Sequence, residues 1–97
     1  MKTRENSLKG KRRITFSIMA PRAKEVSLAG DFNQWRKDTH PMKMGKHGQW
    51  TRTVFVAPGE YQYKFVVDGA WKTDEKNPNK RRNCFGTRNN IIKVAPK

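Results

Sequence analysis

Hydrophobic and polar residues alternate one by one in several short segments of this chain. In residues 14–19, for example, Ile14, Phe16 and Ile18 are separated by single residues, two of which carry hydroxyl groups. A period of two places alternate side chains on opposite faces of a strand. The same pattern, with its β-branched and aromatic residues, predicts strands at Ile14–Met19, Val26–Gly30, Trp50–Val56, Tyr61–Val67, Ala70–Lys72 and Asn90–Val94.

Turn signals separate these segments. Ala57-Pro58-Gly59-Glu60 is a turn because proline presets φ and glycine accepts positive φ, and Asp68-Gly69 is the two-residue type that closes a hairpin. The stretches Asp31–Gly48 and Thr73–Asn83 are mainly polar and are expected to be loops, and no segment has helical periodicity. Six or seven short strands at this spacing predict an all-β fold, an immunoglobulin-like antiparallel β-sandwich.

The length of 97 residues allows one domain. Residues 1–13 are expected to be a flexible basic N-terminal arm, and residues 14–97 a single β-sandwich domain. The chain has one cysteine, Cys84, which we expect to be a part-buried structural thiol in a reducing compartment. Because no apolar run is long enough to span a membrane and no signal-peptide pattern begins the chain, we expect a cytoplasmic protein without a membrane partner.

The charge is strongly positive, with 22 lysines and arginines against 8 acidic residues and a net charge of +14. Such a charge favours encounters with polyanions. The basic residues are distributed over nearly every segment, however, and do not form one recognisable nucleic-acid-binding module. A solvated basic surface therefore explains the charge more simply, although nucleic acid stays open as an alternative partner.

Several motifs, in order, resemble one known family. The phrase Val26–Trp35, with its Gly-Asp-Phe-Asn-Gln-Trp ending, is followed by Pro58–Gly69, by Trp71 and by Gly86–Ile92. Together they resemble the early-set glycogen-binding domains, the carbohydrate-binding modules of family 48, over about residues 14–95. Such domains occur in the β-subunit of AMP-activated protein kinase and ahead of the barrel in isoamylases and glycogen branching enzymes. The resemblance implies an early-set, immunoglobulin-like sandwich.

The resemblance also implies a ligand, a site and a kind of partner. The ligand is an α-glucan such as glycogen, starch or a malto-oligosaccharide, and the partner is a glucan-active enzyme or a kinase-like protein. By motif position, the residues implied to bind the glucan are Trp35, Lys64, Trp71, Phe85, Thr87 and Asn89. Phe85 stands where the family has a bulky aliphatic residue that inserts into the glucan ring.

These residue types suit a sugar. A glucose ring has apolar faces and a rim of hydroxyls, so aromatic platforms and fixed hydrogen-bond groups hold it. Trp35 and Trp71 lie where strands give way to turns, which favours exposure. Trp50 begins an alternating strand, so we expect it in the core together with Phe16, Leu28, Tyr63, Phe65 and Ile92. Lys64 alternates with Tyr63 and Phe65 and therefore points outward.

Catalysis is the least favoured of the other function classes. Hydrolysis of a glycoside needs two carboxylates flanking the scissile bond, and the available acidic residues are accounted for by turns and loops. We therefore expect no enzyme, no metal site and no cofactor. A regulatory protein-interaction module without sugar binding, which presents a sheet edge to its partner, is the second alternative. Salt separates the hypotheses, because phosphate binding weakens steeply with ionic strength and stacking on a neutral glucan does not.

Overall fold

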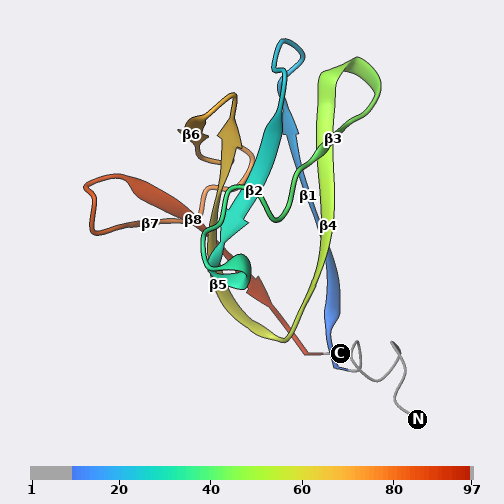
Figure 1. Cartoon of the computed structure of the whole chain (residues 1–97). Helices are drawn as coiled ribbons and strands as arrows, with labels where there is room; N and C mark the ends of the chain where they lie inside the picture. The colour runs from blue at the N-terminus through green and yellow to red at the C-terminus, as the bar shows by residue number, and fades with distance from the viewer. Residues whose placement is uncertain (1–9, 97) are drawn as a thin grey trace.

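Two antiparallel sheets pack face to face in the computed structural model, which describes residues 10–96 (Figure 1). The smaller sheet has the order β1-β4-β3 and the larger sheet the order β2-β5-β8-β7, with β6 paired to β5. The strands are β1 (Arg12–Met19), β2 (Val26–Gly30), β3 (Lys43–Met44), β4 (Gln49–Val56), β5 (Gly59–Val67), β6 (Ala70–Lys72), β7 (Lys80–Arg82) and β8 (Arg88–Val94). The predicted all-β, immunoglobulin-like sandwich is confirmed.

The sandwich has short 3-10 turns and, within the described residues, no α-helix. The 3-10 turns are η1 (Asp31–Asn33) after β2 and η2 (Lys46–Gly48) before β4. No helix in residues 10–96 is long and apolar enough to cross a membrane.

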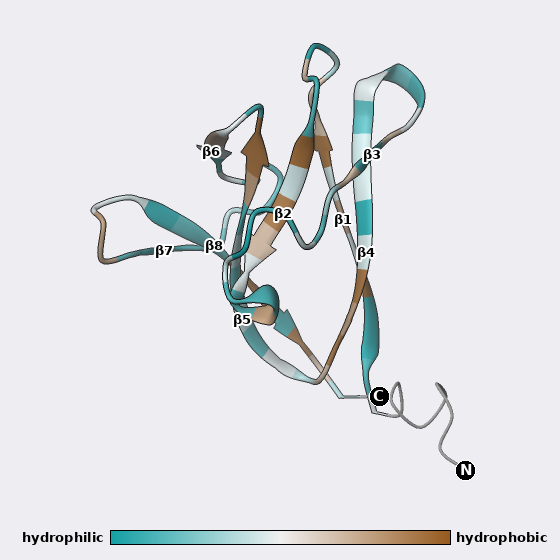
Figure 2. Cartoon of the chain, in the orientation of Figure 1, coloured by the Kyte–Doolittle hydropathy of each residue, from teal (hydrophilic) through white to brown (hydrophobic). Residues whose placement is uncertain are grey.

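The core lies between the sheets. Strand β2 is mainly hydrophobic in colour in Figure 2, and four of its five residues are buried. Phe16 of β1 contacts Tyr63 of β5 edge to face, with ring centroids 4.7 Å apart, so aromatic rings join the two sheets. The expected core residues Phe16, Leu28, Trp50, Tyr63 and Phe65 are buried, and Ile92 is half-buried against them. The indole N–H of Trp50 donates to the carbonyl of Ala20.

The predicted hairpin turn joins β5 to β6. Val67 pairs with Ala70, and the two residues between them, Asp68 and Gly69, both have positive φ, as a type I′ turn requires. The Asp68 carboxylate also accepts hydrogen bonds from the backbone N–H groups of Glu25 and Lys24. These bonds stabilise the ionised form and lower the pKa of Asp68.

Some details differ from the sequence-based predictions. The polar stretch 73–83 contains strand β7, because its backbone pairs with β8 although its side chains are cationic. The first strand begins at Arg12, two residues before Ile14. Arg12 donates to the carbonyl of Ala95, which joins the start of β1 to the segment after β8. The remainder of the predicted N-terminal arm lies mostly outside the described residues. Cys84 is exposed, not part-buried, since it lies in the turn of the β7–β8 hairpin.

Candidate functional site

The predicted site residues of the sheet lie on the face of the larger sheet that points away from the core. In β5, Tyr63 and Phe65 point inward, so Lys64 and its alternate neighbours point outward. The register places Trp71 beside Val66 and Ile91 beside Gln62. We call this surface the outer face, and its residues are Gln62, Lys64, Val66, Trp71, Asn89 and Ile91.

Two tryptophans lie together at one end of the outer face. Trp71 follows the β5–β6 turn and is 44% exposed, while Trp35 follows η1 and is half-buried. Their ring centroids are 6.2 Å apart and the rings are inclined at 54°. The ammonium group of Lys37 lies 5.9 Å from the centre of the Trp71 ring, within reach of a cation–π contact. The pair is an angled aromatic surface.

The position of Trp35 depends on a tight turn after β2. A Cβ at Gly30 would lie 2.6 Å from the carbonyl oxygen of Gln62, so only glycine allows β2 and the turn to approach β5 this closely. The Trp35 backbone N–H donates to the Gly30 carbonyl at 2.9 Å. Gln34 and Trp35 both have left-handed φ, 55° and 60°. Such a conformation is costly for residues other than glycine, and it persists because surrounding contacts fix it.

Lys64 lies in the middle of the outer face. Its ammonium group donates to Thr87 Oγ1 at 3.1 Å, and the residue as a whole is only 8% exposed. The predicted outward direction is confirmed, but the side chain is packed along the sheet, not extended into solvent. Its stem is covered by neighbours while its nitrogen reaches the β7–β8 hairpin.

The β7–β8 hairpin holds the remaining predicted residues. Asn89 donates to Gln62 Oε1 at 3.0 Å, so the start of β8 is tied to β5 by side chains as well as by backbone. Phe85 is 86% exposed near the hairpin turn, a hydrophobic segment between hydrophilic strands (Figure 2). The hairpin extends from the body of the sandwich (Figure 1).

Asn83 organises this hairpin and was missed by the sequence-based prediction. Its carboxamide oxygen accepts from the backbone N–H groups of Phe85 and Thr87. Its amide nitrogen donates to Thr87 Oγ1 at 2.7 Å and to Asn89 Oδ1 at 2.9 Å. Asn83 therefore connects three of the predicted site residues. Asparagine before a turn was a signal for local backbone bonding, but not for these side-chain partners.

The structure thus brings the predicted residues together in two groups. Trp35 and Trp71 form the aromatic pair, and Lys64, Thr87 and Asn89 belong to one hydrogen-bonded cluster. Phe85 is joined to that cluster through its backbone, and its ring stands apart from both groups among the described residues. The sequence did not single out Gln62 and Asp31, which connect the two groups: the Asp31 carboxylate accepts from the Gln62 N–H and from the Trp35 indole.

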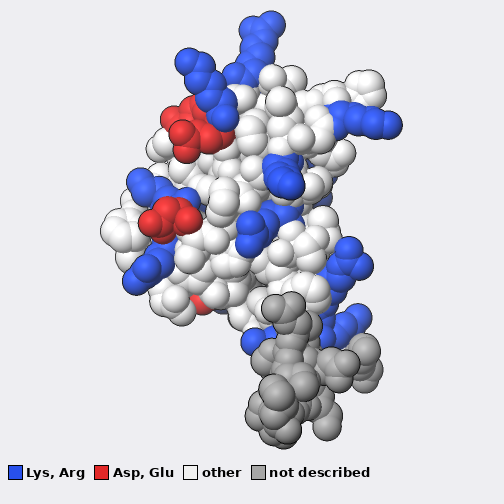
Figure 3. Space-filling view, turned by 45° about the vertical axis from the view of Figure 1, so that its right-hand side comes forward, with Lys and Arg blue, Asp and Glu red and all other residues white. Residues whose placement is uncertain are grey.

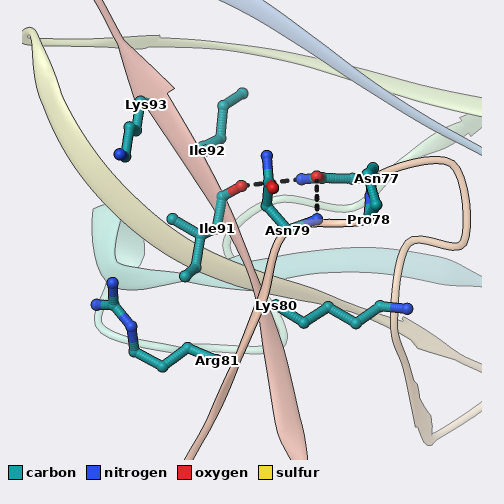
Figure 4. A pocket seen from close by; sticks show the side chains of 8 residues that line it. All are labelled: Asn77, Pro78, Asn79, Lys80, Arg81, Ile91, Ile92 and Lys93. Atoms are coloured by element: carbon teal, nitrogen blue, oxygen red, sulfur yellow. Dashed lines mark hydrogen bonds between the residues drawn. The ribbon is translucent and has the colours of Figure 1, made fainter.

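A hollow of about 650 Å³ lies along β8, and none of the residues predicted to bind glucan lines it (Figure 4). Asn77 donates to the carbonyl of Ile91 at its rim, and Lys80 and Arg81 border it from β7. The tryptophan pair, in contrast, is an open surface, which is what stacking on a sugar ring requires. We therefore give the aromatic pair more weight than the deeper hollow.

Charge and acidic clusters add little to the site. Lysines and arginines are scattered over the visible surface in Figure 3 and do not gather into one patch. Within residues 10–96, no three histidine, cysteine or acidic side chains are arranged to hold a metal ion.

Comparison with known proteins adds an independent line of evidence. Residues 14–97 match the family model described as the glycogen recognition site of AMP-activated protein kinase. The subunit beta-1 of that kinase from Sus scrofa is 42% identical over 71 residues, which are 73% of this chain and 55% of that relative. The chloroplastic protein FLOURY ENDOSPERM 6 of Oryza sativa subsp. japonica is 32% identical over 86% of this chain and 15% of its own. The 1,4-alpha-glucan branching enzyme of Deinococcus radiodurans is 40% identical over 70% of this chain and 9% of its own. The chain therefore spans between 9% and 55% of the length of these relatives.

Proposed function

This chain belongs to the family of glycogen recognition domains, and from this premise we propose that it binds α-glucans such as glycogen, starch or malto-oligosaccharides without catalysing a reaction on them. The observation that carries the proposal is the pair formed by Trp35 and Trp71, two rings 6.2 Å apart on the outer face. With Trp71 exposed and Trp35 half-buried, the pair presents aromatic surface on which a sugar ring can stack.

The inclination of the pair favours an α-glucan over a flat polymer. Successive glucose rings of an α-1,4-linked chain turn relative to one another, so two platforms inclined at 54° can each lie against a ring of the same chain. Hydroxyl groups at the sugar rims then need donors and acceptors near the platforms. Lys64, Thr87 and Asn89 offer an ammonium, a hydroxyl and a carboxamide on the same face.

Phe85 is proposed to complete the site from the hairpin. Its ring is 86% exposed and has no core to fill, so it is free to contact a ligand that lies on the outer face. Binding at one site is expected to be weak, about micromolar to millimolar, because a stacked ring contributes only about 1 kcal/mol beyond its buried area. A polymer that engages several copies gains affinity by avidity.

The testing experiment compares matched aromatic variants. Trp35→Ala combined with Trp71→Ala is expected to remain folded and to lose retention on glycogen or amylose in native gels. Phe55→Ala is the control, because Phe55 is 45% exposed, almost the same as Trp71, but lies on the smaller sheet. Retention of the double variant on glucan, or equal loss in the control, would contradict the proposal.

Salt provides a second check on the nature of the ligand. Retention on neutral glucan is expected to change little between low and moderate ionic strength, whereas binding to nucleic acid through phosphate contacts weakens by orders of magnitude. Retention that collapses with added salt would instead support the polyanion alternative, given the net charge of +14.

The proposed partner is a glucan-active enzyme or a kinase. Relatives named as a kinase subunit and as a branching enzyme support this.

The exposed free thiol of Cys84 supports a reducing compartment such as the cytoplasm.

A further inference from the structure

Asp31 uses both of its carboxylate oxygens close to the aromatic pair. Oδ1 accepts a hydrogen bond from the Trp35 indole N–H at 3.0 Å. Oδ2 accepts one from the backbone N–H of Gln62 at 2.8 Å. One side chain therefore connects the indole of Trp35 to a residue of the central strand β5, which is fixed in the sheet.

The Trp35 ring lies on a turn that depends on contacts around it. Gln34 and Trp35 both have left-handed φ, a conformation that persists only where the surrounding structure fixes it. The tilt relative to Trp71 is what fits two platforms to one turning glucan chain. A hydrogen bond to an ionised carboxylate is stronger than a neutral one, and it is directional.

The strand that anchors Asp31 also carries the polar part of the site. Gln62 donates its backbone N–H to Asp31, and its side-chain oxygen accepts from Asn89. A movement of Asp31 relative to Gln62 would therefore change the position of the platform relative to the hydrogen-bonding cluster. Asp31 belongs to the motif that carries the family resemblance, but it lies outside the set of residues implied to contact the glucan.

From these contacts we infer that Asp31 is a positioning residue for glucan binding, whose carboxylate holds the Trp35 indole at its angle to Trp71. Asp31 does not itself contact the sugar. The inference rests on the proposed function. It explains why an acidic residue occupies this place in a strongly basic chain.

The test is a double-mutant cycle between Asp31→Asn and Trp35→Phe. Asparagine has a single acceptor oxygen, which stays with the shorter bond from Gln62, so its amide group faces the indole N–H and repels it. Asp31→Asn is expected to weaken binding of a malto-oligosaccharide by about 5-fold, the loss that corresponds to one hydrogen bond. Phenylalanine has no N–H, so in the Trp35→Phe background the same change at Asp31 is expected to alter affinity by less than about 2-fold.

A spectroscopic signal separates positioning from general stability. The indole N–H resonance of Trp35, identified by its absence in Trp35→Phe, is expected to shift in Asp31→Asn without any glucan present. Asp38→Asn is the matched control, an exposed carboxylate of the same loop that makes no hydrogen bond to either tryptophan within the described residues. It should move neither the resonance nor the affinity.

The outcomes distinguish the two proposals. An equal loss of affinity from Asp31→Asn in both backgrounds, or an unmoved indole resonance, would overturn the positioning role while glucan binding stands. If the wild-type protein binds no glucan, the proposed function fails, and the resonance alone still reports whether Asp31 orients the ring. If Asp31→Asn does not fold, an unchanged affinity of the Trp35→Phe single variant would also overturn the positioning role, since the N–H would then be dispensable.

Discussion

Lys64 and Thr87 are joined by a hydrogen bond of 3.1 Å from the ammonium group to the threonine hydroxyl, although only 8% of the lysine is exposed. Among the described residues, the ion pairs within 4.0 Å are Lys80 with Glu75 and Arg81 with Glu60, and neither involves Lys64. A lysine that is packed in this way without a carboxylate partner adds little to stability. We therefore propose that a ligand explains its place on the outer face better than stability does.

Replacing Lys64 by methionine tests this explanation. Methionine fills a similar volume and removes the charge, so we expect Lys64→Met to melt at the same temperature as the wild type or higher. Glucan affinity is expected to fall about 10-fold, because a charge-assisted hydrogen bond is lost. Thermal melting and affinity electrophoresis measure the two effects.

Lys93→Met is the control for Lys64. Lys93 lies on β8 opposite Glu60 and is exposed, so its loss should leave both melting temperature and affinity nearly unchanged. A Lys64→Met protein that unfolds, or that binds glucan as well as the wild type, would show that the lysine is structural.

Asn83 provides a second prediction because its side chain makes four hydrogen bonds in the β7–β8 hairpin. Asn83→Ala leaves the N–H groups of Phe85 and Thr87 without this acceptor. We expect a loss of about 1–2 kcal/mol in the free energy of unfolding and weaker glucan binding, since Phe85 and Thr87 are no longer held. Chemical denaturation measures the free energy of unfolding, and glucan titration measures the affinity.

Cys84→Ser is the control for Asn83→Ala, because it changes the next residue of the same hairpin. Cys84 is exposed on the same hairpin, so the substitution should affect neither stability nor binding by a measurable amount. Normal glucan affinity in Asn83→Ala would mean that the hairpin does not take part in the site.

The sequence was informative about the strands because their side chains alternate. Trp50 is predicted to be buried because it begins an alternating strand, and it is buried. Asn90 begins the predicted strand Asn90–Val94. It is fully buried, donating to the carbonyls of Asp74 and Asn77 and accepting from the Asp74 N–H. Strand β7 was not predictable from its side chains, since Lys80, Arg81 and Arg82 show no alternation and the strand exists by pairing with β8.

The candidate site was predictable only in part. Except for the ring of Phe85, the residues implied by the family resemblance form an aromatic pair and a hydrogen-bonded cluster, and their roles in binding stay predictions. Asp31 lies only 4 positions before Trp35. The sequence nevertheless contained no signal for their hydrogen bond, because the carboxylate is also held by the backbone N–H of Gln62, 31 positions along the chain. Contacts of this kind depend on strand register, and register follows from the whole sheet.

His40 adds a pH-dependent feature next to the turn that carries Trp35. Its Nδ1 accepts a hydrogen bond from Asn33 Nδ2 at 2.9 Å. The Asn33 amide is fixed in this orientation because it also donates to the carbonyl of Leu28 and accepts from the N–H of Gly30. Burial first, and the nearby positive charge of Arg52 second, lower the pKa of His40 below 6.5.

The sign of the pH effect follows from this pKa. Above pH 6.5 His40 is neutral in both the folded and the unfolded chain, so its contribution to stability is fully present. Below that value the unfolded chain takes up the proton first, and the free energy of unfolding falls with pH until the lower folded pKa is passed. A protonated Nδ1 would also face the Asn33 amide donor, which loosens η1.

We therefore expect the denaturant concentration at the unfolding midpoint to decrease as the pH is lowered from about 7.5 to about 5.5. The decrease is expected to be smaller in His40→Gln. His47→Gln, at an exposed position, should retain the wild-type slope. The same slope in His40→Gln and in the wild type would assign the pH dependence to another group; Asp68 is not that group, since its lowered pKa places its titration below this range.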